Sequence, residues 1–129
     1  EHVISEEVEQ ALMKLAEEEK VHITEFTVAP MIEQGKGKSY HEWFIEFENY
    51  PDSLEDFSRR LDERMRQKNI YYDDLIAGNI LQPLIITPIR KNGFIDYMKS
   101  IGKLGGQNKV PRLSNDRKIA DKLVKWRVQ

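Results

Sequence analysis

Cysteine is absent from this chain of 129 residues. The chain therefore has neither a disulfide framework nor a thiolate metal site. It also lacks any apolar run as long as a membrane-spanning helix or the hydrophobic region of a signal peptide. These absences fit a protein of the reducing cytoplasm with no membrane partner, and we expect that location.

Familiar catalytic motifs are missing as well. The phosphate-binding patterns GxxxxGK[ST] and GxGxxG do not occur. GxSxG, the serine hydrolase pattern, does not occur either. His2, His22 and His41 lack the paired spacing of zinc ligands. We therefore expect no metal site, and we expect these histidines to be packed or solvent-exposed.

Composition indicates a single globular domain over residues 1–129. Hydrophobic residues make up 40% of the chain and charged residues 33%. The charge is unevenly distributed, because residues 1–89 contain 9 Lys and Arg against 19 Asp and Glu, and residues 90–129 contain 11 against 3. The basic C-terminal third could contact nucleic acid, nucleotide phosphates or an acidic surface of another domain. It could equally pair with the acidic part of its own chain.

Hydrophobic periodicity predicts the order helix, strand, strand, helix, strand, helix, helix. The expected elements are a helix beginning at Ser5, strands over 22–32 and 39–48, a helix over 54–69 with a further turn or two, a strand over 81–90, and helices over 94–101 and 116–128. This order predicts an α+β fold, a compact sandwich of a small three-stranded mixed or antiparallel sheet with helices packed mainly on one face. The other face would then be free to dock.

Residues 39–48 alternate between two sets of side chains. His41, Trp43, Ile45 and Phe47 are expected to face the core, with the intervening glutamates outward. Two prolines, at 83 and 88, place the third strand at an edge of the sheet or at a strand end.

Three helix starts carry side chains suited to capping. Ser5 would cap the first helix. Ser53 or Asp52 would cap the helix near residue 54. Ser114 or Asn115 would cap the last helix.

The least ordinary stretch is KSIGKLGGQNKVPRLSNDRK, from Lys99 to Lys118. Gly105 and Gly106 let the backbone turn through positive φ or approach a ligand closely. Lys103, Lys109 and Arg112 place positive charge around these glycines. The combination suggests contact with a phosphate or a carboxylate. Two simpler roles stay open: a solvated connector between helices, and an Arg112 that pairs with Asp116 or a helix end.

The same stretch resembles a known family. GKLGGQNKVPRLSNDRK, with YYDDLIAGNILQP before it, is similar to the C-terminal domain of the auxin-responsive (Gretchen Hagen) acyl acid–amido synthetases, and more to their bacterial relatives than to the plant enzymes. Plant members share the sparser pattern Gly-Gln-x-Lys-x-Pro-Arg, which falls here on Gly106, Gln107, Lys109, Pro111 and Arg112. The opening EHVIS resembles the start of that domain, so the resemblance spans nearly the whole chain.

This resemblance implies a mobile C-terminal domain of an adenylate-forming enzyme, which closes over the active site of its own large N-terminal adenylation domain. The full enzyme would use ATP and Mg²⁺ to activate a carboxylic acid as acyl-AMP and pass the acyl group to an amine, commonly an amino acid. Lys109 would be catalytic, approaching the ATP phosphates. Around it, the nucleotide-binding residues would be Lys103, Gly105, Gly106, Gln107 and Arg112. The isolated domain would be inactive and would hold no ATP.

The alternative is a small α+β binding module that uses its basic third for nucleic acid or an acidic protein partner. Nucleic acid is not expected, because the predicted strands carry no aromatic RNA-binding motif. A structural domain that docks a partner through its charged faces is the third possibility.

Overall fold

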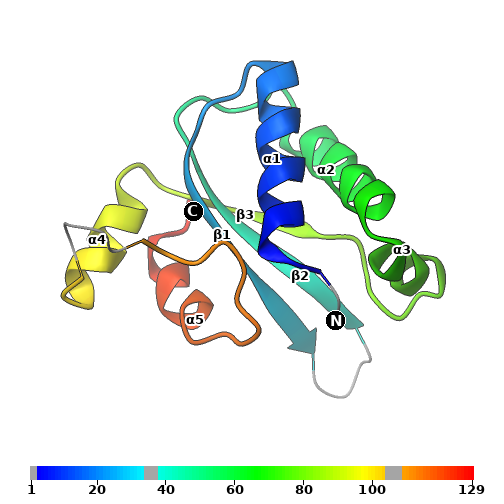
Figure 1. Cartoon of the computed structure of the whole chain (residues 1–129). Coiled ribbons are helices and arrows are strands. Elements are labelled where there is room, and N and C mark those ends of the chain that lie inside the picture. The colour runs from blue at the N-terminus through cyan, green and yellow to red at the C-terminus, as the bar shows by residue number, and fades with distance from the viewer. Residues whose placement is uncertain (1–2, 34–37, 104–108) are drawn as a thin grey trace.

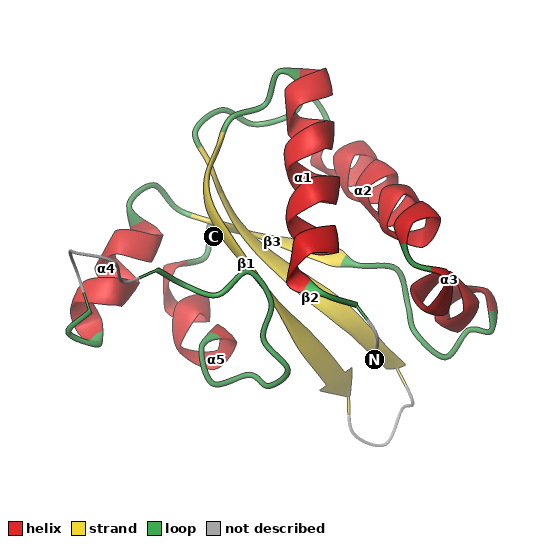
Figure 2. Ribbon diagram, in the orientation of Figure 1, coloured by secondary structure: helices red, strands yellow, loops and turns green. Residues whose placement is uncertain are grey.

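The computed structural model describes residues 3–33, 38–103 and 109–129. Figures 1 and 2 show helices on both sides of a small sheet. The elements in chain order are α1 (Ser5–Glu19), β1 (Ile23–Glu33), β2 (Lys38–Phe47), α2 (Leu54–Lys68), α3 (Ile70–Ala77), β3 (Ile85–Ile89), α4 (Gly93–Ser100), α5 (Ala120–Leu123) and the 3₁₀ turn η1 (Val124–Trp126). None of the described helices is both long enough and apolar enough to span a membrane.

The sheet has the order β1-β2-β3 and is mixed. β1 and β2 form an antiparallel hairpin, whose register shifts between Ile23 and Glu25. β3 runs parallel to β2 because α2 and α3 carry the chain back across the sheet before it starts. Pro88 lies in this edge strand, as the sequence predicted. The α+β class with a three-stranded mixed sheet is therefore confirmed.

One face of the sheet is covered by α1, α2 and α3. Leu12 of α1 and Leu61 of α2 are fully buried there against Trp43 and Ile45 of β2. Burying one such leucine contributes about 1.5–3 kcal/mol to folding. The two longest helices, α1 and α2, thus share this face and pack against each other.

The opposite face is covered by α4 and α5. Phe94 of α4 and Leu123 of α5 pack with Phe44 of β2 and Ile89 of β3 in a second buried cluster. The expectation of a free second face is therefore wrong. The periodicity that predicted helices over 94–101 and 116–128 did not show which face of the sheet these helices would cover.

The two glutamates of β2 were expected to face outward, and this is also wrong. Glu46 is only 4% exposed, and its carboxylate accepts hydrogen bonds from the backbone N–H groups of Asn92 (2.8 Å) and Phe94 (3.2 Å) at the start of α4. Glu42 is 8% exposed and accepts a hydrogen bond from the Thr87 hydroxyl. Both carboxylates lie on the covered second face, where they meet helix and strand donors.

Helix caps were predicted correctly at one of the first two sites. Ser53 caps α2, since its hydroxyl accepts a hydrogen bond from the N–H of Asp56 at 3.1 Å. Ser5 is instead the first residue inside α1. Ile4 occupies the cap position, and its N–H donates to the Glu7 carboxylate at 3.1 Å. The Glu7 carboxylate, and not Ser5, therefore provides the side-chain hydrogen-bond acceptor at the start of this helix.

Candidate functional site

The basic stretch between α4 and α5 is the candidate site, and its first anchor is the end of α4. The N–H of Gly102 donates to Lys99 O (3.0 Å), and the N–H of Lys103 donates to Met98 O (2.9 Å). Gly102 has φ +73°, the left-handed conformation that closes a helix in this way. The chain therefore leaves α4 in a defined direction, with Lys103 exposed immediately after the cap.

Gly105, Gly106 and Gln107 lie outside the described residues, which resume at Lys109. Lys109 is exposed, whereas the next residue, Val110, is 7% exposed and belongs to the second buried cluster. Lys109 is thus held at the surface directly beside a core residue.

Residues 111–114 run along the outer edge of β1. The N–H of Val28 donates to Arg112 O at 3.0 Å, and the N–H of Ser114 donates back to Val28 O at 2.9 Å. The buried hydroxyl of Thr27 donates to Pro111 O at 2.6 Å. This pairing gives the strand edge a partner and fixes the backbone that follows Lys109.

The guanidinium of Arg112 is bound by residues of β1. It forms an ion pair with Glu25, donates to Phe26 O at 3.3 Å, and lies 4.5 Å from the centre of the Phe26 ring. Its ion pair is thus with Glu25, 87 residues away along the chain, and not with Asp116. Any phosphate bound by Arg112 would share this guanidinium with Glu25.

Arg117, which the sequence analysis did not single out, is the second arginine held against the sheet. It pairs with Glu42 and with Asp121, each at 3.0 Å, and donates to Pro30 O at 3.1 Å. Two arginines of the basic third therefore bind acidic residues of β1 and β2, as the self-pairing alternative allowed. The predicted helix over 116–128 is wrong in its extent, because residues 115–119 form bends and turns and α5 covers only Ala120–Leu123. Ile119 is at its cap position, so the predicted caps Ser114 and Asn115 are wrong as well.

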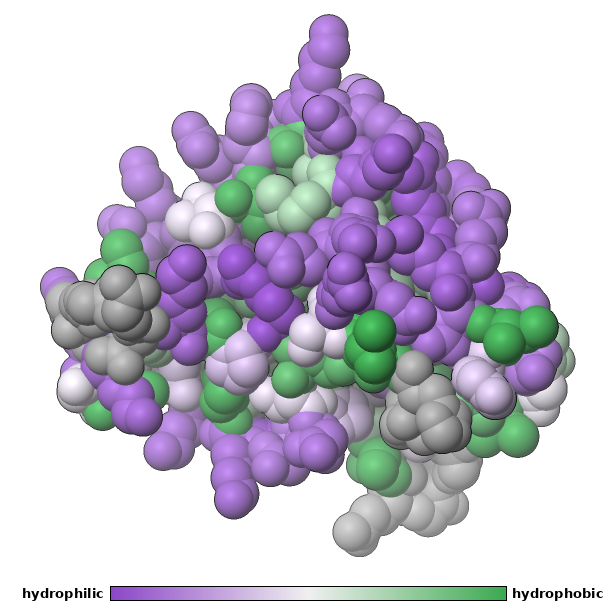
Figure 3. All heavy atoms as spheres, in the orientation of Figure 1, coloured by the Kyte–Doolittle hydropathy of each residue, from purple (hydrophilic) through white to green (hydrophobic). Residues whose placement is uncertain are grey.

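A half-open hollow of about 810 Å³ lies beside this segment. Its walls are the hairpin ends of β1 and β2, Val3 before α1, Leu81, and residues 113–116, 118 and 119. Figure 3 shows patches of apolar side chains on the lower half of the molecule, whereas hydrophilic side chains dominate the upper half. Neither Lys103 nor Lys109 lines the hollow.

The two histidines described have structural contacts. His22 lies beside Asn49, with 2.9 Å between its Nδ1 and the amide oxygen. His41 is 5% exposed, and its ring lies 5.6 Å from the ring of Tyr72. Within residues 3–33, 38–103 and 109–129, no three histidine, aspartate or glutamate side chains converge as a metal site would require.

Comparison with known proteins assigns this fold to a family. The family model described as "GH3 family C-terminal domain" matches residues 6–118. The chain is similar to a solved structure of "GH3.15 acyl acid amido synthetase", with a TM-score of 0.73 and 15% identity over 95% of this chain and 24% of that one. A second structure, "AtGH3.15 acyl acid amido synthetase in complex with 2,4-DB", has a TM-score of 0.71 and 14% identity over the same shares. No curated protein sequence matches.

The chain thus spans about a quarter of the length of these solved structures. At such identity the structural likeness shows the fold, while the family model matches most of the sequence. This protein belongs to the GH3 C-terminal domain family.

Proposed function

We propose that residues 1–129 form the mobile C-terminal domain of an ATP-dependent acid–amido synthetase of the adenylate-forming type. Its partner would be a large N-terminal adenylation domain of the same polypeptide. The family match and the 24% share of the similar structures support this arrangement. A relation to the bacterial branch and a cytoplasmic location stay predictions from the sequence.

The proposed reaction has two steps. A carboxylate oxygen of the acid attacks the α-phosphorus of ATP, which forms acyl-AMP and releases pyrophosphate. The nitrogen of an amine, commonly that of an amino acid, then attacks the acyl carbon. The bond between this carbon and the phosphate oxygen breaks, AMP leaves with the electron pair of that bond, and the nitrogen releases a proton as the amide forms. Mg²⁺ would neutralise phosphate charge, with ligands from the phosphates and the N-terminal domain.

The position of Lys109 is the observation that carries this proposal. Its backbone lies directly before buried Val110 and two residues before the Pro111 carbonyl bound by Thr27. A lysine ammonium held in this way could approach the α-phosphate and the leaving pyrophosphate when the domain closes, and stabilise the charge that develops there. Lys103 would lie at the other end of the same loop. Gly105, Gly106, Gln107 and Arg112 as nucleotide contacts stay predictions.

The test is Lys109→Ala in the full-length enzyme that contains this domain. The rate of adenylation, measured as acid-dependent ATP–pyrophosphate exchange, should fall by about 10²–10³-fold, because one preorganised positive charge is lost. Affinity for the acid should change little, since its pocket would lie on the other domain. Preformed acyl-AMP should restore most of amide formation.

Lys122→Ala is the matched control, because Lys122 is also an exposed lysine of the basic third. It should leave exchange unchanged. A properly folded Lys109→Ala enzyme that adenylates at the wild-type rate would remove Lys109 from the mechanism. The chain of 129 residues alone should catalyse no exchange, and clear exchange by a pure preparation would contradict the division of the site between two domains.

The alternative of a nucleic-acid module has less support. Arg112 and Arg117 are held by carboxylates of β1 and β2, so their charges are largely neutralised within the domain. Binding to unrelated nucleic acids that weakens steeply with added salt would favour this alternative.

A further inference from the structure

We propose that Thr27 and Glu25 of β1 are positioning residues for Lys109. They would act by clamping residues 110–114 to the edge of β1, an arrangement that we call the β1 clamp. The role of Lys109 rests on the proposed function, whereas the existence of the clamp does not.

The first contact of the clamp comes from Thr27. Its side chain is 1% exposed and lies on the second face of the sheet, as does that of its neighbour but one, Ala29. The hydroxyl donates to Pro111 O at 2.6 Å. Proline has no N–H, so this carbonyl is its one backbone group able to form a hydrogen bond, and Thr27 satisfies it.

The second contact comes from Glu25, which follows a shift in the register of the hairpin. The pairing of β1 with β2 shifts between Ile23 and Glu25 and is regular from Glu25 onward, so Glu25 and Thr27 alternate regularly along the strand. Glu25 also accepts a hydrogen bond from the N–H of Phe26 at 3.0 Å, so its carboxylate is fixed before it meets Arg112.

The third contact of the β1 clamp comes from Arg112, on the face of the sheet that α1 and α2 cover. Its guanidinium lies over the ring of Phe26, which is 2% exposed in the cluster formed with α1 and α2. Thr27 packs on the face of α4 and α5, so the segment is held from both faces of the sheet. The exchange of hydrogen bonds between Val28 and residues 112 and 114 secures the edge itself.

Little freedom remains between the clamp and Lys109. The ring of Pro111 fixes its own φ, and a residue before proline is restricted to extended conformations, so Val110 is restricted as well. Val110 is also buried. Lys109 is therefore the first residue outside a stiff segment. A positively charged side chain stabilises a transition state only when it is held where negative charge develops. A displacement of about 1 Å at a reacting centre strongly slows the reaction.

Hydrogen exchange in the full-length enzyme tests whether the clamp exists. Thr27→Val keeps the shape of the side chain but removes the donor, so exchange in peptides covering 109–114 should rise several-fold. Thr27→Ser, which retains the hydroxyl, should stay close to the wild type. Tyr72→Phe is the control, because it removes a buried hydroxyl that binds Asp62 on the other side of the sheet. It should leave exchange in 109–114 unchanged. Unaltered exchange in Thr27→Val would overturn the clamp.

A double-mutant cycle with Lys109 tests the positioning role. Thr27→Val should slow ATP–pyrophosphate exchange by about tenfold in the wild-type background, with little change in the KM for the acid. It should have no further effect in the Lys109→Ala background, since no ammonium remains to be positioned. Equal slowing in both backgrounds would overturn positioning and leave only a structural role for Thr27.

Glu25→Gln gives a second route if Thr27→Val folds poorly, because Glu25 lies at the partly exposed sheet edge. It should show the same dependence on Lys109, and equal slowing with and without Lys109 would again overturn positioning. A wild-type rate for Lys109→Ala alone would refute the proposed function and, with it, the positioning role. The hydrogen-exchange result would then still decide whether the clamp exists.

Discussion

Glu46 of β2 caps α4 through Phe94, whose backbone N–H donates to the buried carboxylate at 3.2 Å across 48 residues of sequence. The same carboxylate accepts the N–H of Asn92 at 2.8 Å. Asn92 itself occupies the cap position but contributes no side-chain hydrogen bond to the helix. A carboxylate at this end of a helix meets unpaired N–H groups and the positive end of the helix dipole. Glu46 therefore joins the central strand to α4 on the second face.

Glu46→Gln should lower the free energy of unfolding by about 1–3 kcal/mol, because an amide accepts these bonds less strongly and buries an N–H₂ group among them. Urea denaturation near neutral pH measures the loss. Glu48→Gln makes the same chemical change at an exposed position two residues later, and should stay within about 0.5 kcal/mol of the wild type. Equal effects of the two variants would show that the cap contributes nothing.

Gly93→Ala should also destabilise the second face. A methyl group there would lie 2.4 Å from Cγ2 of Ile89 and 3.0 Å from Cβ of Trp126, so β3 and the C-terminal segment would have to shift. Overpacking of this kind costs about 1–3 kcal/mol. Thermal and urea unfolding measure the loss of stability. Because a larger side chain would crowd Ile89 and Trp126 further, Gly93→Val should lose still more. Wild-type stability in Gly93→Ala would mean that α4 moves away at no cost.

Tyr72 should make the domain sensitive to alkaline pH. Burial, and then the charge of Asp62, raise the pKa of the Tyr72 hydroxyl well above its ordinary value of 10.0. Above about pH 10 the unfolded chain loses this proton while the folded chain keeps it, so the stability that this shift contributes is present below pH 10 and falls as pH rises. The loss from one such group reaches at most about 1.4 kcal/mol per pH unit.

Urea denaturation of the wild type and of Tyr72→Phe between about pH 8 and 11 checks this expectation. Tyr72→Phe should be the less stable at pH 8, because the hydrogen bond to Asp62 is lost. The difference should narrow above pH 10. Tyr71→Phe, at an exposed neighbouring position, should keep the wild-type slope. A constant difference between wild type and Tyr72→Phe would contradict the raised pKa.

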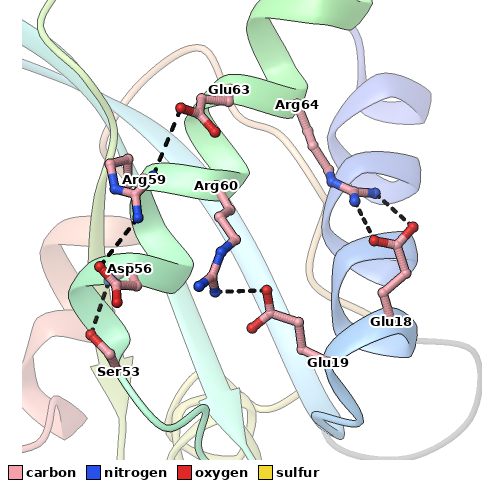
Figure 4. A network of polar contacts seen from close by, with 8 residues as sticks. All are labelled: Glu18, Glu19, Ser53, Asp56, Arg59, Arg60, Glu63 and Arg64. Carbon is pink, nitrogen blue, oxygen red and sulfur yellow. Dashed lines mark hydrogen bonds and ion pairs between the residues drawn. The ribbon is translucent and has the colours of Figure 1, made fainter.

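The ion pairs that join α1 to α2 should contribute little. Figure 4 shows Arg64 reaching Glu18, and Arg60 reaching Glu19 at 2.8 Å. Arg64→Met should lower the free energy of unfolding by less than about 1 kcal/mol, and by less still in about 1 M salt, because these side chains are partly exposed and screened. A cycle with Glu18→Gln isolates the pair. A coupling energy above about 2 kcal/mol that persists in high salt would contradict this expectation.

Local patterns were enough to predict most of the fold. Hydrophobic periodicity predicted the helices of the first face, and alternation around Trp43 predicted the second strand of the hairpin. Alternation also misled, because it does not distinguish a face covered by other helices from one open to water. The partners of Glu42 and Glu46 lie at least 45 residues away. No local signal could have indicated them.

Local sequence likewise predicted one part of the candidate site and could not predict the other. The resemblance singled out the stretch that follows α4 and Lys109 within it, and α4 ends at Ser100, next to the predicted end at residue 101. The contacts of Arg112 could not be predicted, since they depend on residues 111–114 joining the edge of β1, which brings Arg112 to Glu25 and Phe26. Arg117 was missed for the same reason. A sequence shows that these arginines are charged, but only the fold shows which carboxylates they meet.

The short pairing at the far edge of the sheet has a consequence for solubility. Arg127 bridges to Ile89, and the N–H of Val128 donates to Pro88 O at 2.9 Å, so the last residues cover part of β3. Ile85, at the start of the same strand, is 47% exposed. Residues 127 and 128 therefore keep part of this apolar edge from pairing with a strand of another molecule.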